Sequence, residues 1–501
     1  MKIAGLWNNH DCSFCVLEDG VPVVHAELER YIREKEPKGD SYKFLKELYD
    51  ESEIDYWITA EGCFVNKHSF NKECYEVGHH QAHAANAFYT SNYQESLILT
   101  IDGGGIDQDQ WTATTAWKGI DNKIYPYKII PKEKLNIGNI WSRVTEQVFE
   151  LSTGHPYGHS AGTVMATSCL GNQHVYLEEF TNNPYGFCDS WHLRKEKDDE
   201  QARYNVAAAL QQWTQGIVIQ LVDDALKWYP SENLCLAGGV ALNCVMTTQL
   251  YETFPELKNI HVTPTPHDGG LCLGAAQYLW HHELDNPRIK WVDNFTPYLG
   301  QVYSNDLIHE TIDSFADKLE TKTVNDDDII ELLDQQNIIS VYGASSESGR
   351  RALGNRSILA DPRSDKMKDL INEKVKHRQW FRPFAPSILR EEVGKWFVKD
   401  IESPYMNFAV KFKEDMKDKV PAVVHLDGTG RIQTVTKNNN PWYYNLINKF
   451  FKKTGVPILL NTSFNDREPI VETPEHAINC FLGTDIDYLY FPEHQILCKK
   501  K

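Results

Sequence analysis

Long apolar runs are absent from this sequence of 501 residues. No stretch approaches the roughly 20 apolar residues of a membrane-spanning helix, and residues 1–20 lack the basic start and apolar core of a signal peptide. The 11 cysteines are an odd number without the spacing of a disulfide framework, as in reduced cytoplasmic proteins. Cys12 and Cys15 form one C-x-x-C pair without the second pair that a zinc site needs, so we expect a structural role. These absences predict a soluble, cytoplasmic protein with no membrane partner.

Basic residues are in deficit, with 51 Lys and Arg against 70 Asp and Glu and a formal net charge of -19. This balance argues against a surface built to hold DNA or RNA, because neutralising phosphates requires clustered Lys and Arg. A local basic pocket for a small anion remains compatible with it. The P-loop motif G-x-x-x-x-G-K-[ST] is also missing, which excludes a P-loop enzyme.

The chain is too long for one compact core, so we expect at least two domains. Three strands are predicted in "KIAGLWNNHDCSFCVLEDGVPVVHAELER", a helix over 200–228, and strand, turn and helix in "NLCLAGGVALNCVM" and in "IHVTPTPHDGGLCLGAA". Strands that end in glycine turns and lead into helices are typical of an α/β domain. From about 290 to 335 the sequence is polar and irregular, then a strand starts near 337 and arginine becomes dense. We therefore expect domains at 1–330 and 331–501.

The segment "HHQAHAANAFYTSNYQESLILTIDGGG" holds the first chemical cluster. His79 and His83 are four residues apart, so on a helix both imidazoles can reach one metal ion. Asp102 at the end of the following strand and Asp268 before another helix are candidate carboxylate ligands. Two alternatives remain open at this point: a pair of His80 with His83, and histidines that only pack or face solvent.

Glycine turns form the second cluster, at 103–105, 238–239 and 269–270. Each can present backbone N–H groups to a phosphate, although any tight turn uses glycine. Because all three lie between an apolar strand and a helix, they favour a nucleotide cleft.

The C-terminal third holds a third cluster, in which Arg and Lys alternate with Pro, Gly and aromatic residues, as in "RALGNRSILADPR", "NEKVKHRQWFRPFAP", "DGTGRIQTV" and "LLNTSFNDREP". The guanidinium fork suits carboxylate and phosphate oxygens. Solvated ion pairs are the alternative, but the interleaved apolar residues favour a partly buried anion site.

These motifs, together with "NNHDCS" and "LERYIREK", resemble the O-carbamoyltransferases of antibiotic and nodulation-factor biosynthesis over nearly the whole chain. The resemblance implies an N-terminal ASKHA domain, the actin and sugar-kinase architecture, followed by a C-terminal YrdC-like α/β domain. It also implies the activity. The YrdC-like domain would form carbamoyl-adenylate from carbamoyl phosphate and ATP, and the ASKHA domain would pass the carbamoyl group to a hydroxyl of a natural product, sugar or nucleoside.

The cofactors implied are ATP with Mg2+ and a divalent metal, iron(II), in the first domain. Two alternatives remain. The acceptor could be a hydroxymethylated pyrimidine in a nucleotide or in DNA, which the net charge disfavours. The protein could instead be a non-catalytic nucleotide-binding regulator, which the retained His, Asp, Lys and Arg residues disfavour. The oligomeric state is left open.

The resemblance also carries residue roles. His79, His83 and Asp268 would bind the metal, with Asp102 as a further ligand or as the base for the acceptor hydroxyl. His10 and Lys35 would face the transferred group or the nucleotide phosphates. The nucleotide turns would comprise Gly103, Gly104, Gly238, Gly239 and Asn243. Carbamoyl phosphate and the adenylate would be held by Arg351, Lys376, Arg382, Arg431, Asn461 and Ser463.

Two positions depart from the family pattern. Arg350 stands where a proline is usual, and Thr163 stands where a lysine is usual. Loss of a lysine charge near the cleft could mean a different acceptor.

Overall fold

The computed structural model describes residues 1–66, 70, 72–151 and 160–501. Chain contacts divide it into two compact units: Met1–Leu28 with Glu36–Trp291, and Glu29–Lys35 with Val292–Lys501. The predicted boundary near residue 330 therefore falls inside the second unit, after β11 (Leu319–Thr323). Among the described residues, every helix is too short or too polar to span a membrane.

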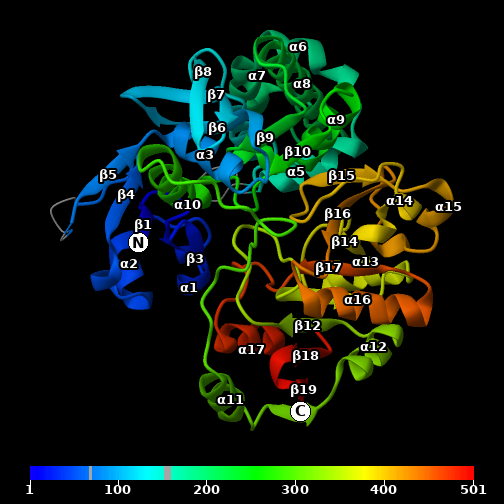
Figure 1. The fold of residues 1–501 in the computed structure, drawn as a ribbon. Helices are drawn as coiled ribbons and strands as arrows, with labels where there is room; N and C mark the ends of the chain where they lie inside the picture. Colours follow the sequence, from blue (N-terminus) through cyan, green and yellow to red (C-terminus); the bar gives the residue numbers. More distant parts are fainter. Residues whose placement is uncertain (67–69, 71, 152–159) are drawn as a thin grey trace. The chain divides into compact units, whose positions relative to one another are not determined.

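The first unit contains two five-stranded sheets with the same connectivity (Figure 1). In each, the central strand is followed by two antiparallel hairpin strands on one side and two parallel strands on the other. One sheet has the order β3-β2-β1-β4-β5 and the other β8-β7-β6-β9-β10. The strands are β1 (Lys2–Trp7), β2 (Ser13–Glu18), β3 (Val21–Glu27), β4 (Tyr56–Ala60), β5 (Cys74–Val77), β6 (Glu95–Asp107), β7 (Gln110–Ile120), β8 (Lys123–Pro131), β9 (Asn233–Ala237) and β10 (Asn259–Val262).

The last strand of each sheet leads into a helix, α3 (His79–Tyr89) after β5 and α10 (Leu271–Tyr278) after β10. Helix α3 packs on the second sheet, α10 packs on the first, and the two helices pack on each other. Their close approach requires glycine, since a Cβ at Gly274 would lie 2.0 Å from the carbonyl oxygen of Ala82. This duplicated arrangement confirms the expected ASKHA architecture.

The remaining helices of the first unit comprise two short ones near the start and a helical region between β8 and β10. They are α1 (Leu28–Ile32), α2 (Ser41–Leu48), α4 (Ile137–Arg143), α5 (Ala161–Thr167), α6 (Leu177–Asn182), α7 (Pro184–Ser190), α8 (Glu200–Trp228) and α9 (Cys244–Thr253), although most of α1 belongs to the second unit. The three-stranded opening and the helix over 200–228 are as predicted. Asp19 (φ 48°) and Gly20 (φ 84°) make the first hairpin turn.

The second unit is built on a nine-stranded mixed sheet, in the order β11-β19-β18-β12-β13-β17-β14-β16-β15. Besides β11 its strands are β12 (Ile339–Tyr342), β13 (Arg356–Ala360), β14 (Ala385–Leu389), β15 (Phe408–Lys411), β16 (Thr429–Val435), β17 (Ile458–Ser463), β18 (Tyr488–Phe491) and β19 (Ile496–Lys500). Its helices are α11 (Asn305–Ser314), α12 (Asp326–Asp334), α13 (Lys366–Lys374), α14 (Val393–Trp396), α15 (Glu414–Lys417), α16 (Pro441–Thr454) and α17 (Pro474–Gly483). Both units are α/β, which confirms the predicted fold class.

Candidate metal centre and anion site

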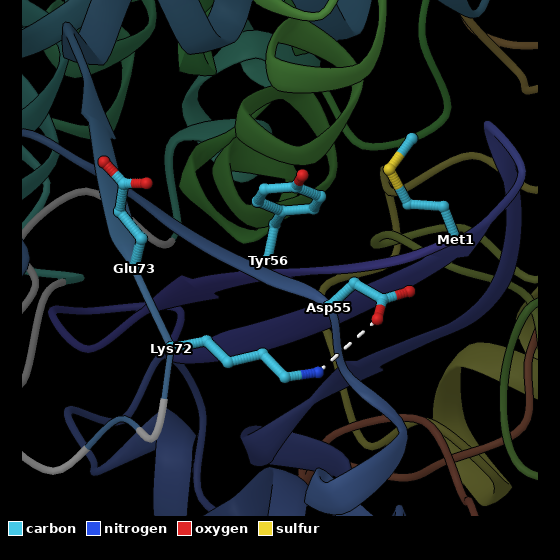
Figure 2. Close-up of a pocket in the computed structure, with 5 residues that line it drawn as sticks. All are labelled: Met1, Asp55, Tyr56, Lys72 and Glu73. Carbon is cyan, nitrogen blue, oxygen red and sulfur yellow. Dashed lines mark hydrogen bonds and ion pairs between the residues drawn. The ribbon is translucent and has the colours of Figure 1, made fainter.

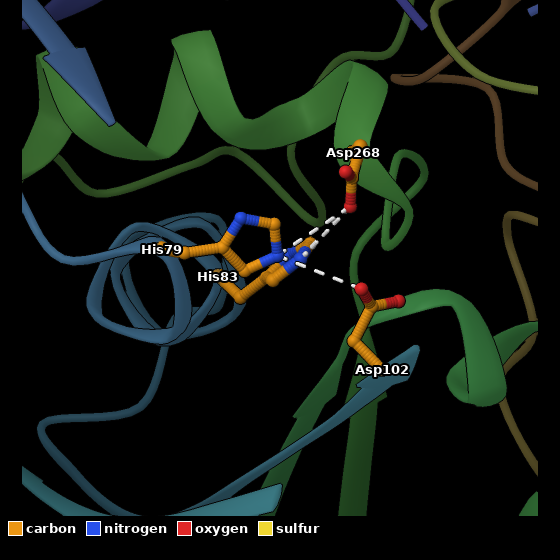
Figure 3. Close-up of side chains that lie close together, drawn as sticks. All are labelled: His79, His83, Asp102 and Asp268. Atoms are coloured by element: carbon orange, nitrogen blue, oxygen red, sulfur yellow. Dashed lines mark ion pairs between the residues drawn. The ribbon is translucent and has the colours of Figure 1, made fainter. Parts of the chain in front are cut away.

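Four potential metal ligands meet in the first unit, where strands of both sheets end (Figure 3). His79 and His83 lie one turn apart on α3, Asp102 lies in β6, and Asp268 follows β10. One donor atom from each lies within 4.8 Å of the others. The structure thus brings together the four residues that the sequence proposed as metal ligands. Ligand binding at the carboxyl ends of parallel strands is the general rule for α/β folds.

The spacing of these donors suits a single ion. The His83 Nε2 lies 3.4 Å from Asp268 Oδ1, and the His79 Nε2 lies 3.5 Å from Asp102 Oδ2 and 3.6 Å from Asp268 Oδ1. Donors that each lie about 2.1 Å from one metal stand roughly 3 to 3.5 Å apart. Both imidazole Nε2 atoms are buried and make no hydrogen bond within the described part of the chain, so the residues fit a divalent cation.

The electrostatics of the cluster point the same way. Burial lowers the pKa of His79, but the carboxylates of Asp268 and Asp102 outweigh burial and raise it above its ordinary value. Burial likewise raises the pKa of Asp102, yet His79, His83 and the N–H of Gly239 hold it well below its usual range. The buried carboxylate of Asp268 and the partly exposed carboxylate of Asp102 therefore favour a positive charge here.

His80 has a different environment from its neighbours. Its Nδ1 lies 2.9 Å from Thr100 Oγ1, and its Nε2 lies 3.3 Å from the carbonyl oxygen of Thr112. Burial lowers the pKa of His80 to about 4. A neutral His80 that packs against strands β6 and β7 leaves His79 with His83 as the pair that faces the carboxylates.

Helix α3 owes its position to Asp107, a residue that the sequence analysis missed. The helix begins after Gly78, which has no side chain to cap it. Instead the Asp107 carboxylate accepts the backbone N–H groups of His80 at 3.1 Å and Gln81 at 3.2 Å, the role of an N-cap. Glycine is required beside it, because a Cβ at Gly78 would lie 2.4 Å from Asp107 Oδ1.

Asp102 is held by one of the predicted glycine turns. Its Oδ1 accepts the N–H of Gly239 at 2.7 Å, and Gly238 adopts a φ of 88° with a Cβ that would lie 2.1 Å from the carbonyl oxygen of Ile101. These glycines thus serve the close contact between β6 and the turn after β9. Gly103 accepts a hydrogen bond from Asn136 at 2.8 Å.

Two other predicted nucleotide contacts have these environments. Gly104 lies in β6 and adopts a φ of 128°. The amide of Asn243 pairs with that of Gln211 on α8, at 2.9 and 3.3 Å, and caps α9 by accepting the N–H of Met246 at 3.0 Å. A role of Asn243 in nucleotide binding stays a prediction.

On its other side Asp268 meets His10. The His10 Nε2 lies 3.3 Å from Asp268 Oδ2, and its Nδ1 lies 3.0 Å from Asp11. Burial lowers the pKa of His10, but Asp268 and Asp11 raise it to about 9. Beyond them, His267 lies 3.3 Å from Glu27. This buried group of Asp11, Glu27 and His267 has no sequence signal beyond the residue types.

The turn that bears Asp268 is fixed through the next residue. The carbonyl oxygen of Gly269 accepts hydrogen bonds from Ser13 Oγ at 3.0 Å and from His25 Nε2 at 2.8 Å. Strands β2 and β3 of the first sheet therefore hold a ligand that follows the last strand of the second sheet.

Lys35 lies outside this cluster, on the segment Glu29–Lys35 that belongs to the second unit. The residues predicted to hold carbamoyl phosphate and the adenylate also lie in that unit. Lys376 is 3% exposed, and its ammonium group donates to Ser463 Oγ at 3.3 Å and to the backbone and side-chain oxygens of Asn465 at 2.7 Å. Burial and Arg378 hold its pKa well below the usual range of a lysine.

We define the cationic site as a group of four basic side chains: Lys376, Arg378, Arg382 and Arg431. Burial and the nearby Arg382 and Arg431 hold the pKa of Arg378 well below its ordinary value. Burial and Arg431 lower the pKa of Arg382 to about 10. Within the described chain neither Arg378 nor Arg382 pairs with a carboxylate, so this site has an excess of positive charge that an anion would neutralise. Arg378 was not among the predicted residues.

Asn461 holds the turn that carries Arg351. Its amide nitrogen lies 3.1 Å from the carbonyl oxygen of Ala352, 3.1 Å from Ser387 Oγ and 2.9 Å from Gln433 Oε1. Asn461 thus contacts Ala352, the residue that follows Arg351 in the chain. Direct contact of Asn461 or Arg351 with carbamoyl phosphate remains a prediction.

A separate surface groove is lined by Met1, Asp55, Tyr56, Lys72 and Glu73 (Figure 2). These residues precede or begin β1, β4 and β5, whereas the metal cluster lies where strands end. Lys72 and Asp55 pair across it at 3.4 Å.

Fold and site together define an α/β protein with a duplicated ASKHA sheet, a His-Asp cluster and a separate cationic site. Family models agree: "Carbamoyltransferase N-terminus" matches residues 181–277 and "Carbamoyltransferase C-terminus" matches residues 330–499. Nodulation protein NolO of Bradyrhizobium diazoefficiens is 34% identical over 82% of this chain and 77% of its own length. An uncharacterized protein of Synechocystis is 33% identical over 98% of this chain and 95% of its own length. The chain belongs to the carbamoyltransferase family and is a transferase enzyme.

Similarity to solved structures is weak. Component A of (R)-2-hydroxyglutaryl-CoA dehydratase from Acidaminococcus fermentans is 14% identical with a TM-score of 0.39, over 56% of this chain and 98% of that chain. Full-length HypF is 12% identical with a TM-score of 0.35, over 57% of this chain and 56% of that chain. The fold assignment therefore rests on the strand order described above.

Proposed function

We propose that this enzyme forms carbamoyl-adenylate from carbamoyl phosphate and ATP in the second unit and transfers the carbamoyl group to a hydroxyl of a small-molecule acceptor in the first. The observation that carries the proposal is the cationic site, where Arg378 and Arg382 pair with no carboxylate of the described chain. Membership of the carbamoyltransferase family supports it.

The first step brings two polyanions together. One carbamoyl phosphate, one ATP and one water give phosphate, pyrophosphate and carbamoyl-AMP. Water first cleaves carbamoyl phosphate into carbamate and phosphate. A carbamate oxygen then forms a P–O bond to the α-phosphorus of ATP, while the bond from that phosphorus to the pyrophosphate oxygen breaks. Lys376, Arg378 and Arg382 neutralise the repulsion and hold the reacting oxygens in place, and this needs fixed cations rather than mobile surface ones. ATP would enter with Mg2+.

The second step transfers the carbamoyl group to the acceptor oxygen and releases AMP. Two histidines and one carboxylate, here His79, His83 and Asp268, form a facial set that suits iron(II) and other divalent metals. When bound, such a metal acts as a Lewis acid that polarises the carbamoyl carbonyl or the adenylate phosphate. Asp102 is 13% exposed whereas the other three side chains are at most 3% exposed. We therefore assign Asp102 to accept the proton of the incoming hydroxyl.

One assay tests this division of labour. Purified protein is incubated with ATP and carbamoyl phosphate, and pyrophosphate and carbamoyl-AMP are measured by mass spectrometry. We expect both products before any acceptor is added. Folded, metal-loaded protein that releases no pyrophosphate would contradict the proposal. Sugars, nucleosides and hydroxymethylated pyrimidines are then screened for a mass gain of one carbamoyl group, which identifies the acceptor class.

A further inference from the structure

The segment Glu29–Lys35 lies in the first 35 residues of the chain but belongs to the second unit. It carries two arginines, Arg30 and Arg33, that reach two loops of that unit. The first loop, 343–355, joins β12 to β13 and bears Arg351. The second loop, 464–473, joins β17 to α17 and follows Ser463. Both loops thus adjoin residues assigned above to the cationic site or predicted to bind its ligands.

Arg30 links the two loops. Its side chain is 2% exposed. The Nη2 group donates to the carbonyl oxygen of Gly349 in the first loop at 2.5 Å, and Nη1 lies 3.9 Å from Glu472 Oε2 in the second. Ser346 donates to the same Glu472 oxygen at 2.6 Å. A buried guanidinium and a buried carboxylate require each other, so these contacts fix the spacing of the loops.

Arg33 donates two hydrogen bonds to the second loop. Its Nη1 donates to the carbonyl oxygen of Ile470 at 2.7 Å and its Nη2 to that of Pro469 at 2.5 Å. The planar guanidinium fork suits two neighbouring oxygens, which an ammonium group cannot match. In the same loop, the Asn465 amide donates to the carbonyl oxygen of Glu468 at 2.6 Å, and Asn465 Oδ1 accepts from Lys376 at 2.7 Å. Arg33 is therefore connected to Lys376 through one short loop.

In the first loop, hydrogen bonds to Glu347 connect the contact of Arg30 with the turn of Arg351. Oε1 of the buried Glu347 accepts the backbone N–H groups of Leu353 and Asn355 at 2.7 Å and of Arg356 at 3.2 Å. These bonds close the turn that carries Arg351, and Gly349, the partner of Arg30, lies inside it. A shift at Gly349 therefore moves the Arg351 turn.

We propose that Arg30 and Arg33 are positioning residues for carbamoyl-adenylate formation. They hold the Arg351 loop and the Ser463–Asn465 loop at one spacing, so that Arg351 and Lys376 stay aligned on the two anionic substrates. Neither arginine needs to touch a substrate. The inference rests on the proposed function, since that function assigns the two loops to adenylate chemistry.

The test uses the full-length enzyme with Arg30→Lys and Arg33→Lys, which keep the charge and lose the fork. Arg390→Lys is the matched control, because Arg390 makes an ion pair with Asp400 in the same unit, away from both loops. Hydrogen–deuterium exchange is measured without substrate, and the KM for carbamoyl phosphate is measured by pyrophosphate release. Loosened alignment is expected to cost on the order of tenfold in KM or kcat.

We expect faster exchange confined to 343–356 and 463–473 and a raised KM in both variants, with neither change in the control. Unchanged exchange in the loops, or a rise spread over the whole unit, overturns the proposal. If wild-type enzyme releases no pyrophosphate, the proposed function fails, and the assignment of Arg30 and Arg33 to that reaction fails with it. Exchange then still reports whether the two arginines couple the loops.

Discussion

The carboxylate of Asp107 accepts the backbone N–H of His80 at 3.1 Å. It does so from the end of β6, 27 residues further along the chain. The contact fixes the first turn of α3, which carries His79, and so determines where the imidazole stands relative to Asp102 on the same strand. One strand thus provides both a candidate metal-site carboxylate and the cap of the helix that bears the histidines.

Replacing Asp107 by alanine should therefore weaken metal binding as well as the fold. Loss of an N-cap costs about 1 kcal/mol of stability, and the freed first turn lets His79 move away from the carboxylates. We expect a lower Tm and a lower metal content by inductively coupled plasma mass spectrometry. Asp199→Ala is the control, since Asp199 caps α8 through Gln201 at 2.9 Å, away from the cluster. If both variants bind metal equally, Asp107 has only a capping role.

Gly105 should not tolerate a side chain. A Cβ there would lie 2.1 Å from Cγ of His79, so Gly105→Ala must push the imidazole aside. We expect loss of bound metal by the same measurement. Gly216→Ala is the matched control, because no atom lies within 4 Å of the Cβ that it would add on α8. That variant should keep its metal and gain up to about 1 kcal/mol from helix propensity. Full metal occupancy in Gly105→Ala would show that His79 is not a ligand.

Local patterns were enough to predict much of this site. The four-residue spacing of His79 and His83 is a helical repeat, and a glycine turn after an apolar strand indicates where Asp268 stands. The glycines at 103–105 were predicted to lie between a strand and a helix, but they lie inside β6, which forms a hairpin with β7. The doubled strand order was not predicted from spacing but from resemblance, because sheet pairing depends on contacts between distant segments.

Residues that act through distant contacts were missed for the same reason. Asp107 caps a helix that precedes it in the chain, Glu27 reaches His267 across the unit, and Arg378 matters through its nearness to other cations. Asn243 and Asn461 were predicted through the resemblance as ligand contacts. Their amides make the internal hydrogen bonds described above, and ligand binding by either residue stays a prediction. A motif identifies a polar residue, but its spacing does not reveal which neighbour its side chain meets.

Removing the metal should separate the two half-reactions. We expect treatment with a chelator, or the change His79→Ala or His83→Ala, to stop carbamoyl transfer to the acceptor. Pyrophosphate release should stay within about threefold of its original rate, since the cationic site lies in the other unit. The measurement is pyrophosphate and carbamoylated product from the same reaction. His80→Asn serves as control and should retain bound metal, because His80 faces Thr100 and not the carboxylates. Loss of both half-reactions on chelation would contradict two separate sites.

The cationic site should be more stable when it is filled. Arg382 pairs with no carboxylate of the described chain, and burial together with the nearby Arg431 lowers its pKa to about 10. Replacing it by glutamine removes like-charge repulsion, so we expect the ligand-free variant to melt at the same temperature as wild type or higher. A ligand that binds only the folded state stabilises by about 2.7 kcal/mol at 100 times its Kd. Inorganic pyrophosphate should therefore raise the Tm of the wild type and raise that of Arg382→Gln less.

Arg363→Gln is the control, because Arg363 already pairs with Asp361 at 2.6 Å and Asp334 at 2.5 Å. This variant should be less stable than the wild type but show the same rise in Tm with pyrophosphate. Equal shifts in wild type and Arg382→Gln would show that Arg382 does not face the anion.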